Sequence, residues 1–377
     1  MSQQPHDLTR KATPSPETGA RLAPGPKDGG RPAAPEPTSG VQPRRLGRGQ
    51  DSQVIQIAAI FVICAILIIA SRAISASFGS WNEVETIVVL SSFLIVIGFG
   101  QGLVILMGGL DLSVGSLITL GGVLTTTWAG AGANAWLLVP VLLVCGFCGL
   151  INGFGVTIAK VPPFIMTLAS GIVIYSLCLG FTAGTPRGSS PSLLSALMQA
   201  RAWGVPVVIY FVILFSIAAA LLQSRSSYGR SLYAVGTNPA AARIAGLRVN
   251  KVIASVYAMS GLCGGIVGMM LVGYSNGATL RMGEPYVLSS IAAVVVGGSS
   301  ILGGTGRFEG TVGGAILLTT ISTIISAVGL EEGWRTVLEG VIIVIALLLL
   351  SWPMPSVFRR RNRTQTSTSN RSARLGK

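Results

Sequence analysis

Long uninterrupted apolar segments, separated by short polar or glycine-rich stretches, dominate this chain from about residue 54 onward. The pattern predicts ten helices, at 54–70, 84–106, 114–130, 136–158, 163–183, 205–222, 252–273, 286–297, 310–328 and 336–352. A helix needs about 20 apolar residues to cross a bilayer, so the eighth is too short to span alone, and a re-entrant segment is one interpretation of it. Continuous rather than alternating apolar runs exclude a transmembrane barrel. We therefore expect an all-α bundle of eight to ten transmembrane helices, with ten favoured.

Composition supports a membrane protein. Half of the 377 residues are hydrophobic and only 11% are charged, whereas soluble domains carry about 25% charged residues. One transmembrane permease domain over residues 51–353 accounts for all the apolar segments, because a helical bundle satisfies its backbone hydrogen bonds internally.

Positive charge is concentrated in three segments. Of the 27 Lys and Arg residues, eight lie in residues 1–50, five in the loop 223–251, and seven, without any acid, from residue 353 to the end. Basic segments flanking apolar spans mark the cytoplasmic side, so both termini and this loop are expected there. They are also expected to attract anionic membrane lipid. This distribution argues against nucleic acid as the partner that a net charge of +14 first suggests. The two tails, 1–50 (rich in proline) and 354–377, are expected to be disordered and cytoplasmic.

The chemistry that the chain lacks is also informative. Its one histidine is His6, in the N-terminal tail, and no sequence of the GxxxxGK[ST] type is present. No catalytic residues and no metal site are therefore expected, and any ATP must be bound by another protein.

Two short motifs precede apolar helices. The first, "MGGLDLSVGS" at 107–116, contains Gly108, Gly109, Asp111 and Ser113. Asp111 or Ser113 is expected to cap the helix that follows at the cytoplasmic surface, with the glycines permitting a sharp turn; direct contact with a solute is the alternative. The second motif, "EGTVG" at 309–313, has Glu309 and Thr311 in matching places, as in a half-repeat.

Some neutral polar side chains lie within the apolar segments. They suit either the translocation path of a neutral solute or hydrogen bonds between helices. These residues are Gln101, Asn152, Thr157, Thr167 and Tyr175.

The loop 223–251 contains a complete short helix. Asn238 is suited to its N-cap, Pro239 to its first position and Gly246 to its end, and "AAARIA" between them favours helix. Such a preformed helix suits docking into a partner's groove, with anchors at Ala241, Ile244 and Ala245 and with Arg243 on another face. An ordinary amphipathic loop helix is the alternative. A second loop, 184–204, is expected on the outer side, either as a partner's docking surface or as a plain surface loop.

The segment "YAVGTNPAAARIAGLRVNKV" resembles the cytoplasmic coupling region of ABC-importer permeases of the ribose and simple-sugar type. "GGLDLSVGS", "INGFGVTIAKVPPFIMTL" and "LSSIAAVVVGGSSILGGTGRFEGTVGGAIL" resemble that family's other motifs in the same order, over most of residues 95–345. Thr237 and the pair Ser289–Ser290 depart from the family's usual residues, which concerns the substrate rather than the transport role.

The resemblance implies a permease subunit of the bacterial inner membrane that is not an enzyme. Its implied partners are a cytoplasmic ATPase that holds ATP and Mg²⁺, an external sugar-binding protein, and a second permease copy in a homodimer or heterodimer. A stand-alone secondary transporter or channel for a small polar solute is the alternative, and it would require ionisable residues inside the spans.

Overall fold

The computed structural model describes residues 48–72, 80–130, 135–329 and a few positions between 333 and 344. Both tails, apart from the first helical residues at 48–50, lie outside the described residues, as does most of the expected helix 336–352.

All nine expected helices up to residue 328 are confirmed. They are α1 (Arg48–Ser71), α2 (Trp81–Leu106), α3 (Val114–Trp128), α4 (Leu138–Thr157), α5 (Pro163–Phe181), α7 (Val207–Ser224), α10 (Val249–Ser275), α11 (Glu284–Val296) and α12 (Phe308–Ala327). α1 begins six residues before the apolar segment does, because helix propagation depends on backbone hydrogen bonds and continues through polar residues.

Several short elements join these helices. They are η1 (Ala135–Leu137), α6 (Ser192–Gln199), β1 (Arg201–Ala202), β2 (Val205–Pro206), α8 (Ser227–Thr237) and α9 (Pro239–Ile244). The helix expected in the loop 223–251 corresponds to α9, and the loop 184–204 contains α6. The sequence did not indicate α8 or the hairpin in which β1 and β2 pair antiparallel.

Within the described residues, six helical segments are long and apolar enough to cross a membrane: α2, η1 with α4, α5, α7, α10 and α12. The apolar part of α1, together with α3 and α11, is shorter than that criterion. The fold is therefore that of a multi-span helical membrane protein.

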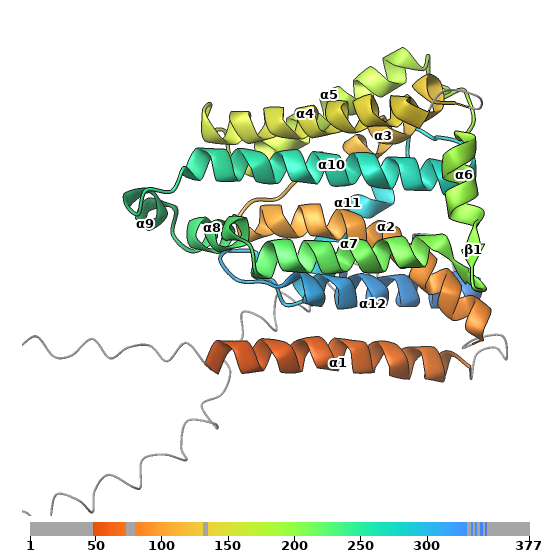
Figure 1. The fold of residues 1–377 in the computed structure, drawn as a ribbon, viewed down its shortest axis with the longest axis horizontal. Coiled ribbons are helices and arrows are strands. Elements are labelled where there is room, and N and C mark those ends of the chain that lie inside the picture. Colours follow the sequence, from red (N-terminus) through yellow and green to blue (C-terminus); the bar gives the residue numbers. More distant parts are fainter. Residues whose placement is uncertain are drawn as a thin grey trace, which may run out of the picture. The chain divides into compact units, whose positions relative to one another are not determined.

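The core of residues 47–377 is built around two long helices, α10 and α2. α10 lies between α4 and α2 (Figure 1) and packs against α3, α4 and α2, while α2 also contacts α7, α11 and α12. Close packing of α4 on α10 depends on small residues: a Cβ on Gly153 would come within 2.6 Å of the Ala254 Cα. The large side chains of Tyr257 on α10 and Phe93 on α2 are almost completely buried.

The two ends of the bundle carry different short elements. α8 and α9 lie together at one end, whereas α6 and β1 lie at the opposite end (Figure 1). α8 and α9 connect α7 to α10, and α6 with the hairpin connects α5 to α7. The loop 223–251 and the loop 184–204 are thus separated by the length of the spanning helices.

Candidate functional site

α9 has the start and stop signals that its sequence predicted. The Asn238 side chain accepts a hydrogen bond of 3.0 Å from the Ala241 amide, and Pro239 occupies the first helical position. Gly246 ends the helix with a left-handed φ of 84°, a conformation that costs glycine little. The helix is fixed at both ends by its own residues.

One side of α9 packs on the rest of the chain and the other is open. Ala242 is buried and forms a small apolar cluster with Val235 and Val249. Ala241, Ala245 and Arg243 are exposed, and Ile244 is 90% exposed. The open side of α9 therefore presents the apolar side chains of Ala241, Ile244 and Ala245.

α8 fixes α9 to the membrane helices. Ser226 caps α8 by accepting from the Gly229 amide at 2.8 Å, and Tyr228 and Ser255 form a hydroxyl–hydroxyl hydrogen bond of 2.9 Å that joins α8 to α10. The Tyr233 hydroxyl donates to the Gly306 carbonyl at 2.7 Å, in the connection between α11 and α12. A displacement of α9 therefore reaches α10 and the α11–α12 connection through direct contacts.

The two charged residues beside the Tyr233–Gly306 hydrogen bond, Arg307 and Glu309, form an ion pair. Arg307 forms an ion pair of 3.0 Å with Glu309 at the start of α12. The hydrogen bonds that Arg307 donates to Glu309 raise the pKa of Arg307 above its ordinary value. Burial raises the pKa of the Tyr233 hydroxyl, and the charge of Glu309 adds to that shift, so Tyr233 stays protonated and able to donate.

Asp111 is the centre of a buried polar network. Its Oδ1 accepts from the Ser113 amide at 3.0 Å and from the Ser113 hydroxyl at 2.6 Å, and its Oδ2 accepts from the Ser260 hydroxyl at 2.7 Å. The Asn152 side-chain amide donates to the Ser113 hydroxyl at 2.9 Å. The network thus joins α3, α4 and α10, and none of the ion pairs in the described part of the chain includes Asp111.

Asp111 lies deeper than the sequence-based topology suggested, and its expected place at the surface end of the bundle is wrong. The carboxylate is fully buried, and its partner Ser260 is near the middle of α10. A Cβ on Gly100 of α2 would lie 2.8 Å from the Ser260 Cα, so Asp111 is level with a point well before the end of α2. The chain turns after Met107 and re-enters the domain before α3 begins.

The glycines of this motif serve that turn in two ways. Gly108 has a left-handed φ of 75°, and a Cβ on Gly109 would lie 2.7 Å from the Tyr257 hydroxyl. Thr167 of α5 accepts from the Leu112 amide and donates to the Leu110 carbonyl, both at 3.1 Å. Non-helical backbone inside the domain is thereby hydrogen-bonded to protein.

The two related motifs have different surroundings. Asp111 is completely buried among hydroxyl and amide donors, whereas Glu309 is partly exposed and paired with Arg307. Thr311 packs towards Gly98 of α2. Both motifs start a helix, but only the first forms a buried hub.

Two of the candidate path residues meet at the turn before α3, where Asn152 bonds to Ser113 and Thr167 bonds to Leu110 and Leu112. Gln101, Asn152 and Thr167 are fully buried. In the described part of the chain, the oxygen and nitrogen of the Gln101 side-chain amide have no hydrogen-bond partner, and the same is true of the Asn152 Oδ1. Thr157 donates to the Gly153 carbonyl within α4. It also lines a cavity at the end of the bundle that carries α9, whereas Tyr175 lines a cavity elsewhere.

That cavity has a volume of about 370 Å³ and lies between α3, α5 and the start of α11. Its polar lining comes from Ser116, Thr119 and Tyr175, with the Arg281–Glu284 ion pair among the other lining residues. Sequence reasoning missed Ser116 and Thr119, although Ser116 belongs to the "DLSVGS" motif and Thr119 follows at helical spacing. Hydroxyl groups on apolar walls suit a small neutral polar solute.

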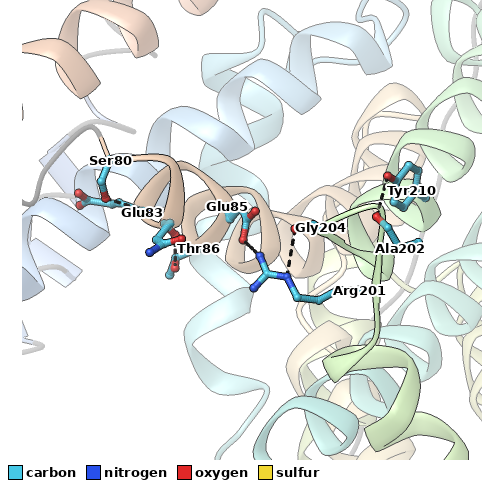
Figure 2. Close-up of polar contacts among 9 residues, drawn as sticks. Ser80, Glu83, Glu85, Thr86, Arg201, Ala202, Gly204 and Tyr210 are labelled. Atoms are coloured by element: carbon cyan, nitrogen blue, oxygen red, sulfur yellow. Dashed lines mark hydrogen bonds and ion pairs between the residues drawn. The ribbon is translucent and has the colours of Figure 1, made fainter.

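An ion pair fixes the hairpin at the opposite end. Figure 2 shows Arg201 of β1 directed at Glu85 of α2, with which it forms a hydrogen-bonded salt bridge, while its Nε donates to the Gly204 carbonyl at 3.1 Å. The Tyr210 hydroxyl of α7 donates to the Ala202 carbonyl at 3.2 Å. The α6–hairpin connection is therefore attached to two spanning helices.

A bundle of apolar helices with an exposed, rigid helix at one end defines a multi-span membrane transport subunit. Residues 83–347 match the family model described as the branched-chain amino acid transport system / permease component, and the chain belongs to that family. It is a permease component of the cell membrane and not an enzyme.

Curated relatives cover most of the chain. The ribose import permease protein RbsC of Haemophilus influenzae is 31% identical over 76% of this chain and 91% of its own length. The galactose/methyl galactoside import permease protein MglC of Escherichia coli is 30% identical over 77% and 92%. The fructose import permease protein FrcC of Rhizobium meliloti is 33% identical over 68% and 74%. No solved structure matches the chain. These relatives support a permease and not a stand-alone secondary transporter or channel.

Proposed function

We propose that this chain forms the membrane path of an ATP-driven importer for a sugar or sugar-like solute. The relatives over most of its length are named as import permeases for ribose, galactose and fructose, and this is the observation that carries the proposal. The hydroxyl-lined cavity between α3 and α5 agrees with a neutral, polyhydroxylated solute.

α9 is the contact with the ATPase in this proposal. Its exposed residues Ala241, Ile244 and Ala245 enter a groove of the partner, because short side chains allow the helix backbone to approach closely. Asn238, Pro239 and Gly246 fix the helix ends, and Arg243 pairs with an acid at the groove's rim. ATP and Mg²⁺ are bound by the ATPase, and the chain itself holds no cofactor.

The solute path is completed by other chains. An external binding protein delivers the solute at the end where α6 and the hairpin lie, and a second permease copy forms the other wall. Tyr175, Ser116 and Thr119 are the side chains best placed to meet the solute. Gln101, Asn152 and Thr167 are fully buried, which supports a role in helix packing rather than in solute contact, and Thr157 bonds within α4.

The proposed topology has ten membrane passes with both termini in the cytoplasm. The basic loop 223–251, now α8 and α9, then lies on the cytoplasmic side with both tails, in agreement with the excess of Lys and Arg there. Glycosylatable or thiol-reactive tags inserted at 184–204 and at 223–251 report the side of each loop directly.

Reconstituted transport tests the function. Liposomes containing the chain, its ATPase and its binding protein are expected to accumulate radiolabelled ribose, galactose or fructose only when ATP is supplied on the ATPase side. Omitting either partner is expected to abolish accumulation. Concentrative uptake by the chain without the ATPase would contradict the proposal and support a secondary transporter.

A further inference from the structure

A second cavity, of about 410 Å³, lies where the α4–α5 connection meets the α9–α10 connection. Four of its eight lining residues are cationic and none is acidic. The lining consists of Thr157, Lys160, Arg243, Leu247, Arg248, Val249, Asn250 and Lys251. The cavity is at the end of the bundle that carries α9, beside the helix but on the side of α4.

The four cations are gathered without protein anions. All four are exposed, and none takes part in the ion pairs found in the described residues. Arg243 donates to the Asn250 side chain at 3.4 Å, and Lys160 has a left-handed φ of 54°. Like charges around one cavity repel one another unless an anion neutralises them, so the arrangement fits an anionic ligand.

An apolar stripe runs along the outer face of α4 and ends at Ile158, next in sequence to Thr157 of the cavity lining. Its members recur at intervals of three or four residues, which places them on one side of the helix. All are large, exposed and hydrophobic: Leu143, Phe147, Ile151, Phe154 and Ile158. The stripe ends at Ile158, two positions before Lys160.

We propose that this pocket binds the phosphate of an anionic phospholipid whose acyl chains lie along the α4 stripe. Cations at the end of an apolar helix face match the two parts of such a lipid, headgroup and tail. A free phosphate would leave the apolar stripe uncovered, and an acidic protein surface would supply the negative charge but no acyl chain to cover the stripe. The site shares Arg243 with α9 but not the exposed Ala241, Ile244 and Ala245, and it has no lining residue in common with the cavity between α3 and α5.

Native mass spectrometry of the full chain in detergent tests the site, with phosphatidylglycerol and phosphatidylcholine as probes. The Lys160→Gln/Lys251→Gln variant removes two pocket cations. The matched control, Arg225→Gln/Arg230→Gln, removes two exposed cations from the α7–α8 segment. We expect phosphatidylglycerol affinity to fall roughly 30-fold in the pocket variant, since each surface cation contributes about fivefold. The control is expected to bind like the wild type.

Further arms separate the alternatives. Ile158→Gln is expected to weaken both lipids, because it alters the acyl contact, and glycerol 3-phosphate is expected not to displace phosphatidylglycerol. Displacement by millimolar glycerol 3-phosphate would show a free-phosphate site and overturn the lipid. Equal losses in both double variants would show diffuse attraction and overturn the pocket. If the double variant cannot be purified, the single variant Arg248→Gln and the competition with glycerol 3-phosphate test the same site.

Discussion

Ser260 donates a hydrogen bond of 2.7 Å to the carboxylate of Asp111, 149 positions earlier in the chain. This bond ties the middle of α10 to the turn that precedes α3. Because Asn152 of α4 joins the same network through Ser113, three helices share one buried carboxylate. Asp111 therefore joins helices and does not cap α3, whose N-cap residue is Ser113 and has no side-chain cap bond.

Replacing Asp111 separates its charge from its hydrogen bonds. Asp111→Asn retains an oxygen that accepts from Ser113 and places an amide beside the Ser260 hydroxyl, whereas Asp111→Ala leaves buried donors without an acceptor. We expect Ala to lower stability by about 3 kcal/mol, more than Asn does. Thermal unfolding in detergent measures the difference. Equal stability of both variants, with transport lost in both, would instead indicate a functional charge.

A glycine-to-alanine substitution, which adds one methyl group, tests the close contact of α4 and α10. In Gly153→Ala the new Cβ would be placed 2.6 Å from the Ala254 Cα, which the backbone of α10 cannot avoid without moving. We expect a loss of about 2 kcal/mol in the free energy of unfolding.

Gly180→Ala is the matched control for that substitution, because nothing lies within 4 Å of the new methyl group. Its stability is expected to be unchanged or slightly higher, since alanine favours helix. A Gly153→Ala variant as stable as the control would show that α4 and α10 are not in contact at this point.

A charge on the open face of α9 is expected to prevent docking without unfolding the bundle. Ala241→Glu places a carboxylate on the exposed face, so we expect normal expression and a pull-down of the ATPase reduced at least about tenfold. Ala196→Glu, on the exposed surface of α6 at the other end, is the control and is expected to retain the ATPase. Retention by Ala241→Glu would show that α9 is an ordinary surface helix.

The Glu85–Arg201 ion pair is expected to stabilise the fold because it neutralises the nearly buried carboxylate of Glu85. Glu85 is nearly buried while Arg201 is half exposed, so Arg201→Met leaves a buried carboxylate without its cation and costs about 2 kcal/mol. Adding Glu85→Leu removes the unpaired charge and is expected to restore at least half of that loss. A thermal double-mutant cycle gives the coupling directly; additive losses would show that the pair is not formed.

Local signals in the sequence determined much of this protein. Apolar segments located the nine helices up to residue 328, because a helix in a bilayer must satisfy its backbone within its own segment. The cap and stop residues of α9 were readable for the same reason, since Asn238 bonds an amide only three positions away. The four ordered motifs indicated the family that the comparisons then showed.

Tertiary structure alone decided where the polar residues lie. Sequence placed Asp111 at a helix start but not at the level of Ser260, because that depth follows from how the chain re-enters the bundle and packs on α10. Gln101 and Tyr175 have similar apolar neighbours in sequence, yet one is buried and the other lines a cavity. Which face of an all-apolar helix meets protein depends on contacts between distant segments, and apolar periodicity carries little of that information when lipid and protein interior are equally hydrophobic.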